Sequence, residues 1–269
     1  MKKFNVLGIV CTHNAQHYIK TFLEYYFNHG IDIYLIDNES TDYTLSIAKN
    51  YLNKNNLFID TYKFTENFEL YNILEFKEII AKKSDYSWFI HLDIDEILEA
   101  EKFQNLNQVI CKVDRLGYNC INFNEFVFIP ESKNLSYINQ NYYNKMRLYY
   151  FFEPAQNRLN RAWKKIDLFD LKSSGGHNVK FNNKKIYPQN FHLRHYICLS
   201  YEHLLTKYKY RKFNQDEINK GWHLKRLNIK KNNIYNFKIN SNFFFTNENK
   251  SLITNSPIKN HFWDLSNFS

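Results

Sequence analysis

The sequence lacks the signals of a membrane-spanning or secreted protein. It has no run of about 18 apolar residues, the length that a helix needs to cross a bilayer. No apolar segment of signal-peptide length follows the first Met-Lys-Lys. The four cysteines lie far apart, which excludes a disulfide framework and the paired spacing of a zinc site: Cys11, Cys111, Cys120 and Cys198. These absences predict a cytoplasmic protein, either free or attached at the inner face of the membrane.

Glycine and proline are also scarce, at six and four residues. No linker rich in Pro, Gly or Ser divides the chain, so we expect one compact unit in two halves, residues 1–130 and 131–269. No Gly-x-Gly turn follows the first predicted strand, and the Walker pattern is absent. The chain therefore lacks the glycine-rich loops that bind phosphate, and it must neutralise any bound phosphate in another way.

The residues that are abundant are apolar, aromatic and basic. Hydrophobic residues make up 44% of the chain and aromatic residues 18%, which allows a sizeable core. The net charge is +9, and the segment 201–240 carries ten Lys or Arg residues against three acids. Such a surface attracts anionic lipid headgroups, phosphorylated substrates or nucleic acid, although a merely solvated charged face is an equal alternative.

Strands and helices alternate in the first 130 residues. Apolar runs predict five strands, at 4–12, 31–36, 57–62, 86–95 and 118–129. Apolar residues at helical spacing predict amphipathic helices between them, as in Ile19, Phe22, Leu23 and Tyr26. This alternation predicts an α/β fold with a doubly wound, mostly parallel sheet.

The alternation is lost beyond Pro130. Short strand-like segments are predicted at 147–152, 166–171 and 191–196, and a helix is predicted from 200 to 212. The C-terminal half is therefore expected to be less regular than the N-terminal half, and it shows no internal repeat.

Three acidic residues follow the strand predicted at 86–95. Ligands of an open α/β sheet collect beyond the carboxyl ends of its strands, which is where Asp93, Asp95 and Glu96 fall. Residues i and i+2 of a strand share a face, so Asp93 and Asp95 can bind one hard cation. A solvated corner with clustered acids is the alternative, because Asp-x-Asp alone is a weak motif.

Three motifs, in this order, resemble glycosyltransferase family 2 and its relatives with the GT-A fold. They are Thr12-His-Asn14, Asp37-Asn-Glu-Ser-Thr-Asp42 and His91-Leu-Asp-Ile-Asp-Glu96. The match covers about the first hundred residues, and three ordered motifs are far more specific than Asp-x-Asp alone. The resemblance implies a GT-A type sheet whose first half, residues 1–130, binds a nucleotide sugar, with residues 131–269 on the acceptor side.

The resemblance assigns the first two motifs to the nucleoside. Thr12 and Asn14 would border the nucleobase and ribose. Asp37 would accept hydrogen bonds from the base or ribose, and Asn38 beside it would also contribute to nucleotide-sugar binding. Asp37 and Ser40 can instead do no more than build a turn and cap the next helix.

The resemblance also implies a divalent cation, Mn²⁺ or Mg²⁺, at the third motif. Asp95 would be its chief ligand, and Asp93 would contact the ion, its water shell or the ribose. Ser174-Gly-Gly-His177 and His192-Leu-Arg-His-Tyr196 resemble the segments in which a histidine completes the metal site, so His177 is a candidate ligand and His195 a weaker one. A purely structural role is the alternative for each histidine.

The remaining candidate residues are predicted by chemistry and position. Lys164, with its neighbours Lys165 and Arg161, can stabilise negative charge on a leaving diphosphate, or it can be ordinary surface charge. An inverting transfer needs a carboxylate that takes the proton of the acceptor hydroxyl. Glu125 is our candidate, because it lies near the end of the fifth predicted strand, on the side of the metal site. Its competitors are Asp167, Asp170 and Glu153.

The sequence and its resemblance to this family together predict a metal-dependent glycosyltransferase that moves a sugar from a nucleotide-diphosphate donor to an acceptor hydroxyl. The resemblance implies inversion, with a glycan or lipid-linked saccharide as acceptor in bacterial surface polysaccharide synthesis. The segment 201–240 would then face an anionic membrane or a phosphate-bearing acceptor. A sugar-phosphate nucleotidyltransferase is one alternative, but it would normally need a glycine-rich loop near the N-terminus. A non-enzymatic basic protein that binds nucleic acid is the other, and it would leave the acids unexplained, so no nucleic acid is expected as a partner.

Overall fold

The chain forms two compact units in the computed structural model, which describes residues 4–53, 56–100, 104–153, 159–227, 229–247 and 251–267. The first unit comprises Met1–Phe64, Leu70–Asn124 and Asn157–Leu193. The second comprises Thr65–Glu69, Glu125–Gln156 and Arg194–Ser269. The two units are therefore interleaved in the sequence, whereas the sequence alone suggested one division near residue 130.

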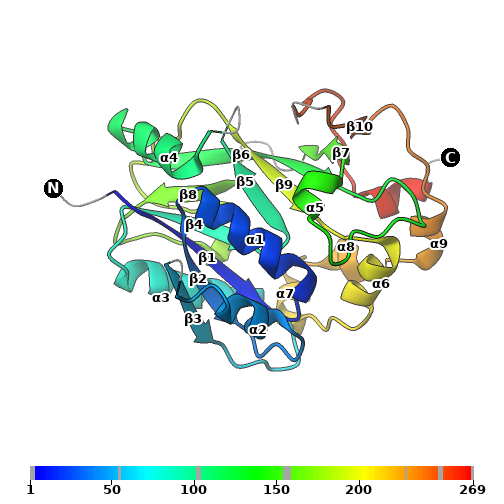
Figure 1. Cartoon of the computed structure of the whole chain (residues 1–269), viewed down its shortest axis with the longest axis horizontal. Coiled ribbons are helices and arrows are strands. Elements are labelled where there is room, and N and C mark those ends of the chain that lie inside the picture. Colours follow the sequence, from blue (N-terminus) through cyan, green and yellow to red (C-terminus); the bar gives the residue numbers. More distant parts are fainter. Residues whose placement is uncertain are drawn as a thin grey trace. The chain divides into compact units, whose positions relative to one another are not determined.

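Four parallel strands form the centre of the first unit, in the spatial order β3-β2-β1-β4 (Figure 1). Their bounds are β1 Val6–Thr12, β2 Asp32–Asp37, β3 Leu57–Thr61 and β4 Trp88–Asp93. Each was predicted as an apolar run, and β1 and β4 are buried along nearly all of their length. Such burial on both faces is typical of parallel strands, because helices cover both sides of the sheet.

Helices connect these strands and cover the sheet. They are α1 Gln16–Asn28, α2 Thr44–Lys49, α3 Leu70–Lys83 and α4 Leu106–Arg115. The predicted stripe of α1 is confirmed, because Ile19, Phe22, Leu23 and Tyr26 are all fully buried. Gly30 follows α1 with a φ of +68°, a left-handed conformation that favours glycine at a helix end. The mixed α/β fold with a mostly parallel central sheet is therefore confirmed.

Two strands of the first unit were not predicted. Strand β8, Asn160–Lys164, pairs antiparallel with β4, and the strand predicted at 118–129, now β6 Cys120–Phe128, pairs with β8 rather than with β4. Strand β5, Glu96–Glu99, follows the acids directly and pairs with β9, Phe191–Tyr196. Both were missed because Asn-Arg-Ala-Trp-Lys and Glu-Ile-Leu-Glu are short and carry charged residues. The strand predicted at 166–171 is wrong, since only an isolated bridge from Asp170 to Lys180 forms there.

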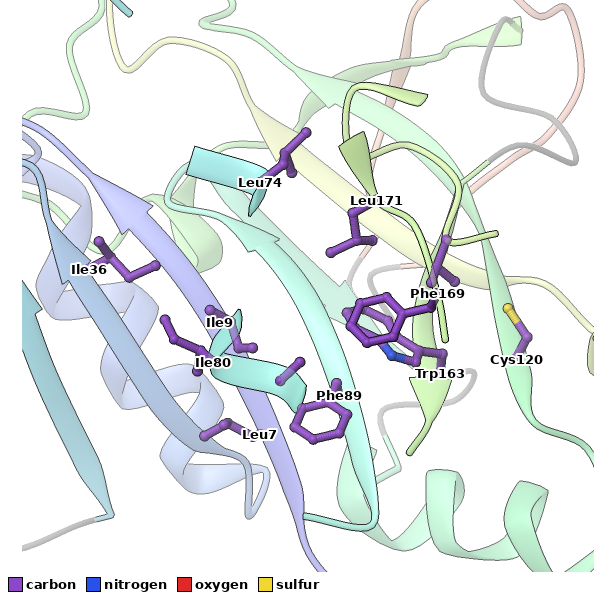
Figure 2. Packing of buried hydrophobic residues seen from close by; sticks show 12 residues of the cluster. Leu7, Ile9, Ile36, Leu74, Ile80, Phe89, Cys120, Trp163, Phe169 and Leu171 are labelled. Atoms are coloured by element: carbon purple, nitrogen blue, oxygen red, sulfur yellow. The ribbon is translucent and has the colours of Figure 1, made fainter. Parts of the chain in front are cut away.

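A hydrophobic cluster fixes one face of this sheet. Leu7 and Ile9 of β1 and Phe89 of β4 belong to one buried cluster with Leu74 and Ile80 of α3, and Ile80 lies beside Ile9 (Figure 2). Trp163 of β8 extends the cluster, and the loop residues Phe169, Leu171 and Val179 pack against it. The loop 166–181 thus serves as part of the cover of the sheet, which explains why apolar residues in it do not mark a strand.

The second unit is built around a smaller antiparallel sheet. Strand β7, Leu148–Phe151, pairs with Phe126–Phe128 of β6, and β10, Phe244–Phe245, pairs with β7. The helices are α5 Tyr142–Lys145, α6 Tyr201–Lys209, α7 Gln215–Asn219, α8 Leu224–Leu227, α9 Lys231–Tyr235 and the 3-10 helix η4 Phe262–Asn267; a further 3-10 turn, η3 Lys172–Ser174, belongs to the first unit. Strand β7, strand β9 and helix α6 confirm three of the predicted segments.

No helix among the described residues is long and apolar enough to span a membrane. All four cysteines are free thiols.

Candidate functional site

The carboxyl ends of three neighbouring strands form one edge of the sheet in the first unit. Thr12 at the end of β1 lies opposite Asp37 at the end of β2, and Cys11 lies opposite Asp93 at the end of β4. The predicted residues Thr12, Asp37 and Asp93 therefore lie side by side, as parallel pairing requires. In an open α/β sheet this edge is where ligands bind.

Thr12 and Asp37 each carry a buried oxygen without a hydrogen-bond partner in the described part of the chain. These oxygens are Thr12 Oγ1 and Asp37 Oδ1. The other carboxylate oxygen of Asp37, Oδ2, accepts a hydrogen bond from the backbone N–H of Ser40 at 3.1 Å. A buried polar atom without a partner costs about 1–3 kcal/mol, so an orphaned hydroxyl and an orphaned carboxylate oxygen on adjacent strands indicate a place for a polar ligand.

Asn14 and Asn38 are held by the protein itself. Asn14 has a φ of +51°, and its side-chain oxygen accepts hydrogen bonds from the backbone N–H groups of Thr41 at 2.8 Å and Asp42 at 3.3 Å. Asn38 donates from Nδ2 to the carbonyl oxygen of Tyr62 at 2.9 Å. These hydrogen bonds hold the loops after β1 and β2 in place. The predicted motif residues Asn14 and Asn38 therefore fix the conformation of this edge of the sheet.

The loop after β2 differs in one detail from the prediction. Ser40 does not cap α2, because its hydroxyl accepts a hydrogen bond from the backbone N–H of Asn14 at 3.0 Å. Asp42, two residues before the helix, accepts with Oδ1 from the backbone N–H of Thr44, the first residue of α2, at 2.9 Å. Ser40 therefore ties the loop after β2 to the loop after β1.

The acids of the third motif form a tight turn, here called the acid turn and defined as residues 93–96. Asp93 ends β4, Ile94 and Asp95 make the turn, and Glu96 begins β5. The sequence suggested that Asp93 and Asp95 are residues i and i+2 of one strand. In the structure only Asp93 belongs to β4, and Asp95 lies in the turn. The side chain of Asp93 is 43% exposed, whereas that of Glu96 is 4% exposed.

Arg161 of β8 lies under the acid turn. Its Nη1 donates to Oδ2 of Asp93 at 3.0 Å and to Oε2 of Glu96 at 2.7 Å, and the residue is only 3% exposed. Charge-assisted hydrogen bonds of this length are among the stronger polar contacts in proteins. Arg161 reaches this place because β8 pairs directly with β4.

Lys77 of α3 is a buried lysine beneath the same turn. Its Nζ donates to the carbonyl oxygen of Leu92 at 2.8 Å and lies 3.1 Å from Nδ1 of His91. Burial lowers the pKa of Lys77, and the nearby Asp93 carboxylate opposes that effect. Burial and the Lys77 charge hold the pKa of His91 well below its usual value, so this histidine is neutral.

Asp93 keeps its negative charge in this setting. Burial alone would raise its pKa, but the positive charges of Arg161 and Lys77 favour the ionised form, and the pKa of Asp93 lies below its usual range. The Nε2 atom of His91 lies 3.9 Å from Asp93 Oδ1, too far for a hydrogen bond. An ionised, half-exposed carboxylate therefore ends β4.

The loop that carries His177 packs against the same strand. Gly176 has a φ of +80°, and a Cβ atom there would lie 2.6 Å from Nε2 of His91. Only glycine permits this close approach, and it brings His177 near enough to His91 to influence the pKa of His91. The predicted candidate His177 thus lies in the neighbourhood of Asp93.

Lys164 lies elsewhere, and its prediction needs correction. It pairs in register with Trp88, at the amino end of β4, and its Nζ contacts Oδ1 of Asp114 at 2.8 Å. Trp88 and Asp93 are separated by the length of β4, about 16 Å for a rise of about 3.3 Å per residue. The structure therefore places Arg161, and not Lys164, beside Asp93.

Comparison with known proteins identifies the family. The model of glycosyl transferase family 2 matches residues 9–163, more than half of the chain, including Thr12, Asp37, the acid turn and Arg161. The chain belongs to glycosyl transferase family 2. It is therefore a glycosyltransferase, and its α/β architecture corresponds to the GT-A-like fold of that family.

Solved structures similar to this glycosyltransferase include TarS of S. aureus. The match to TarS has 13% identity and a TM-score of 0.46, and it covers 86% of this chain and 42% of that chain. A second match, to TarS 1-349 in complex with UDP-GlcNAc, has 14% identity and a TM-score of 0.44, covering 71% of this chain and 58% of that chain. The glycosyltransferase chain thus spans less than half the length of TarS. No curated protein matches the sequence.

Glu125 of the glycosyltransferase lies in the second unit. It is buried, and its Oε1 accepts a hydrogen bond from Nδ1 of His195 on β9 at 2.7 Å. Next to this pair, the Tyr150 hydroxyl lies 2.9 Å from Nδ1 of His261, and Glu125 contributes to raising the pKa of Tyr150 after the larger effect of burial. The pairing of Glu125 with His195 was not predicted, although the motif that drew attention to His195 was.

The basic segment 201–240 folds as short helices of the second unit. Several of its cations lie over aromatic rings, as Arg211 does over Phe68 and Tyr208. The helix α8 is a single turn, Leu-Lys-Arg-Leu, whose two leucines, Leu224 and Leu227, are both nearly half exposed. The segment therefore combines positive charge with exposed apolar side chains.

Among the described residues, no group of three or more His, Cys, Asp or Glu side chains is arranged to hold a metal ion.

Proposed function

We propose that this glycosyltransferase moves one sugar from a nucleotide-diphosphate donor to an acceptor hydroxyl. The observation that carries the proposal is the common edge of the sheet, where two orphaned oxygens, on Thr12 and Asp37, lie beside the ionised carboxylate of Asp93. The first two suit the polar edge of a nucleoside, and the last suits a cation that accompanies a diphosphate. The family membership and this edge together favour a nucleotide sugar as donor.

Different residues would contact the donor and fix the loops around it. Thr12 Oγ1 can donate or accept a hydrogen bond, and Asp37 Oδ1 accepts one from a base N–H or a ribose hydroxyl. Asn14 and Asn38 contribute by fixing the loops that present these atoms, since their own side chains bond to the backbone of neighbouring loops. Lys164 has no part in this arrangement, because it lies at the other end of β4.

A divalent cation, Mn²⁺ or Mg²⁺, fits the acid turn as it is built. Such ions commonly bind one or two protein carboxylates and complete their coordination with substrate phosphate oxygens and water, so a cluster of three protein ligands is not required. Asp93 is ionised and half exposed, and Asp95 follows it on the turn. Asp93 and Asp95 would hold the ion, with His177 as a third candidate, and the ion would stabilise negative charge on the leaving diphosphate.

Glu125 is the proposed general base of an inverting transfer. A base of this kind accepts the proton of the acceptor hydroxyl while that oxygen forms its bond to the sugar. The support lies in the second unit, where the hydrogen bond from His195 Nδ1 to Oε1 fixes the orientation of the Glu125 carboxylate. His195 thereby becomes a positioning residue for the base, which replaces its weaker candidacy as a metal ligand.

The acceptor is proposed to be a glycan or lipid-linked saccharide of the bacterial surface, reached at an anionic membrane face. The support is the segment 201–240, where Lys225 and Arg226 of α8 stand between the exposed Leu224 and Leu227. Cations beside exposed leucines favour anionic lipid surfaces. Cosedimentation with phosphatidylglycerol vesicles should fall in Leu224→Ser/Leu227→Ser and remain in Leu168→Ser, which removes the exposed leucine of another loop. Equal binding of both variants would refute the membrane contact.

A thermal-shift series tests the proposed function directly. The wild type should be stabilised by one nucleoside diphosphate of a panel, UDP, GDP, CDP or dTDP, only when Mn²⁺ or Mg²⁺ is present. Asp95→Asn should lose that metal-dependent stabilisation while its melting temperature without ligand stays unchanged, because the residue lies on a partly exposed turn. Asp85→Asn, an exposed carboxylate in the loop before β4, is the control and should respond like the wild type. A normal response by Asp95→Asn would refute the metal site.

A further inference from the structure

One guanidinium holds both ends of the acid turn. The same nitrogen, Nη1 of Arg161, donates to Asp93 at the last residue of β4 and to Glu96 at the first residue of β5. Only Ile94 and Asp95 stand between these two points. Arg161 and Glu96 are almost fully buried, so this contact is shielded from the solvent that weakens surface ion pairs.

The buried pair has a clear structural cause. Strand β8 pairs with β4 and thereby brings Arg161 to the end of β4, and Lys77 of α3 donates to the carbonyl oxygen of Leu92. Buried cations therefore bind the last two residues of β4, Leu92 and Asp93, and the first residue of β5, Glu96. A carboxylate that ligates a metal is commonly held by a hydrogen bond of this kind from a neighbouring residue.

We propose that Arg161 is the positioning residue of the acid turn: by clamping Asp93 and Glu96 it fixes the placement of Asp93 and Asp95 for the cation and diphosphate. This inference rests on the proposed function. It assigns no contact between Arg161 and the sugar donor, because the guanidinium is buried and engaged by the two acids. Glu96 acts as the anchor of the clamp rather than as a ligand.

Two effects of Arg161 on a cation oppose each other. Its positive charge, 3.0 Å from Asp93, repels a divalent ion and would by itself weaken metal binding. Its hydrogen bonds order the turn and thereby strengthen metal binding. A substitution that removes the charge alone therefore cannot be interpreted safely, since Arg161→Met also leaves Glu96 buried without its partner, a change that costs about 3–5 kcal/mol.

A charge-neutral double variant separates the two effects. Arg161→Gln/Glu96→Gln removes one positive and one negative charge, so the net charge of the cluster is unchanged and no buried charge is left alone. If Arg161 acts as a clamp, Mn²⁺ titration in the presence of UDP should show a dissociation constant raised about 10- to 100-fold, the usual cost of losing a residue that orients a ligand. If only net charge matters, the dissociation constant should stay the same, and the proposal is overturned.

A second measurement needs no metal. Hydrogen–deuterium exchange of the peptide spanning residues 91–98 should be faster in the double variant than in the wild type, because the turn loses its clamp. Unchanged exchange would also overturn the proposal. The control is Glu217→Gln/His223→Gln, which removes a buried pair of 3.1 Å in the second unit and should alter neither the Mn²⁺ affinity nor the exchange of this peptide.

The two proposals fail in different ways. If the wild type binds neither Mn²⁺ nor a nucleoside diphosphate, the proposed function is refuted. The proposed role of Arg161 in positioning Asp93 and Asp95 for these ligands is then refuted as well. A wild type that binds both, beside a double variant that binds equally well, refutes the clamp alone. Arg161→Lys keeps the charge but is too short and too mobile to hold both acids, so its dissociation constant for Mn²⁺ should also be raised, and an unchanged value would overturn the clamp.

Discussion

Substitution of Asp37 by Asn tests the nucleoside end of the site with a defined geometry. In the wild type, Oδ2 accepts from the backbone N–H of Ser40, and Oδ1 has no partner in the described part of the chain. An asparagine at this position must use its single oxygen for Ser40. Its amide N–H₂ group then occupies the place of Oδ1 and presents donors where the nucleoside also presents a donor.

The expected loss follows from that geometry. A hydrogen bond to a charged group contributes about 1.5–3 kcal/mol, which corresponds to a 10- to 150-fold weaker affinity for UDP or whichever nucleoside diphosphate the wild type prefers. The melting temperature without ligand should change little, because the bond to Ser40 is kept. Isothermal titration with Mn²⁺ present measures the first quantity, and thermal unfolding measures the second.

The control variant is Asp60→Asn, on the neighbouring strand β3. Asp60 of β3 lies in register with Ile36 and is engaged by Tyr34 and by its own turn, so Asp60→Asn should leave nucleotide affinity unchanged. Nucleotide binding by Asp37→Asn that equals the wild type would show that Asp37 only builds the turn after β2. That result would remove the main support for a nucleoside at this edge.

Two further predictions concern the second unit. Glu125→Gln should lower kcat about 10²- to 10⁴-fold with little change in KM for the donor, as expected for loss of a general base. An unchanged kcat in this variant would remove Glu125 from the mechanism. His195→Gln should shift the pH profile of kcat while retaining part of the activity. Burial lowers the pKa of His261 to about 3, so below its unfolded value of 6.5 the unfolded chain binds the proton and the folded chain does not. His261 therefore makes its full contribution to the free energy of unfolding above about pH 7. This contribution decreases as the pH falls, by about 1.4 kcal/mol between pH 7.5 and 5.5. Denaturant unfolding of wild type and His261→Gln should show that excess slope in the wild type only, and parallel slopes would contradict the assignment.

Local sequence patterns were sufficient for the central strands and their edge. The apolar runs that became β1, β2 and β4 and the helical stripe of α1 depend on residues close together in the chain, and burial follows directly from their pattern. Polar residues that directly follow such strands must lie at one edge of a parallel sheet. For this reason Thr12, Asp37 and Asp93 lie at neighbouring strand ends, and the order of their motifs led to the right family.

Strand order could not be obtained in the same way. Whether β6 or β8 pairs with β4 depends on contacts between segments about 30 and about 70 residues apart, and neither strand carries a local signal for its neighbour. That choice places Arg161 at the carboxyl end of β4 and Lys164 at the amino end, although the two residues are three apart in the sequence. The partners of Lys77 and Glu125 were hidden for the same reason.

The sequence by itself therefore determined which strands form, where they end and which acids stand at their ends, because these properties depend on neighbouring residues and their burial. Only the tertiary structure decided which cations reach those acids. A carboxylate is stabilised by positive charge that lies within a few ångströms, and for Asp93 and Glu96 such a charge comes from Arg161, on a strand more than sixty residues away in the chain.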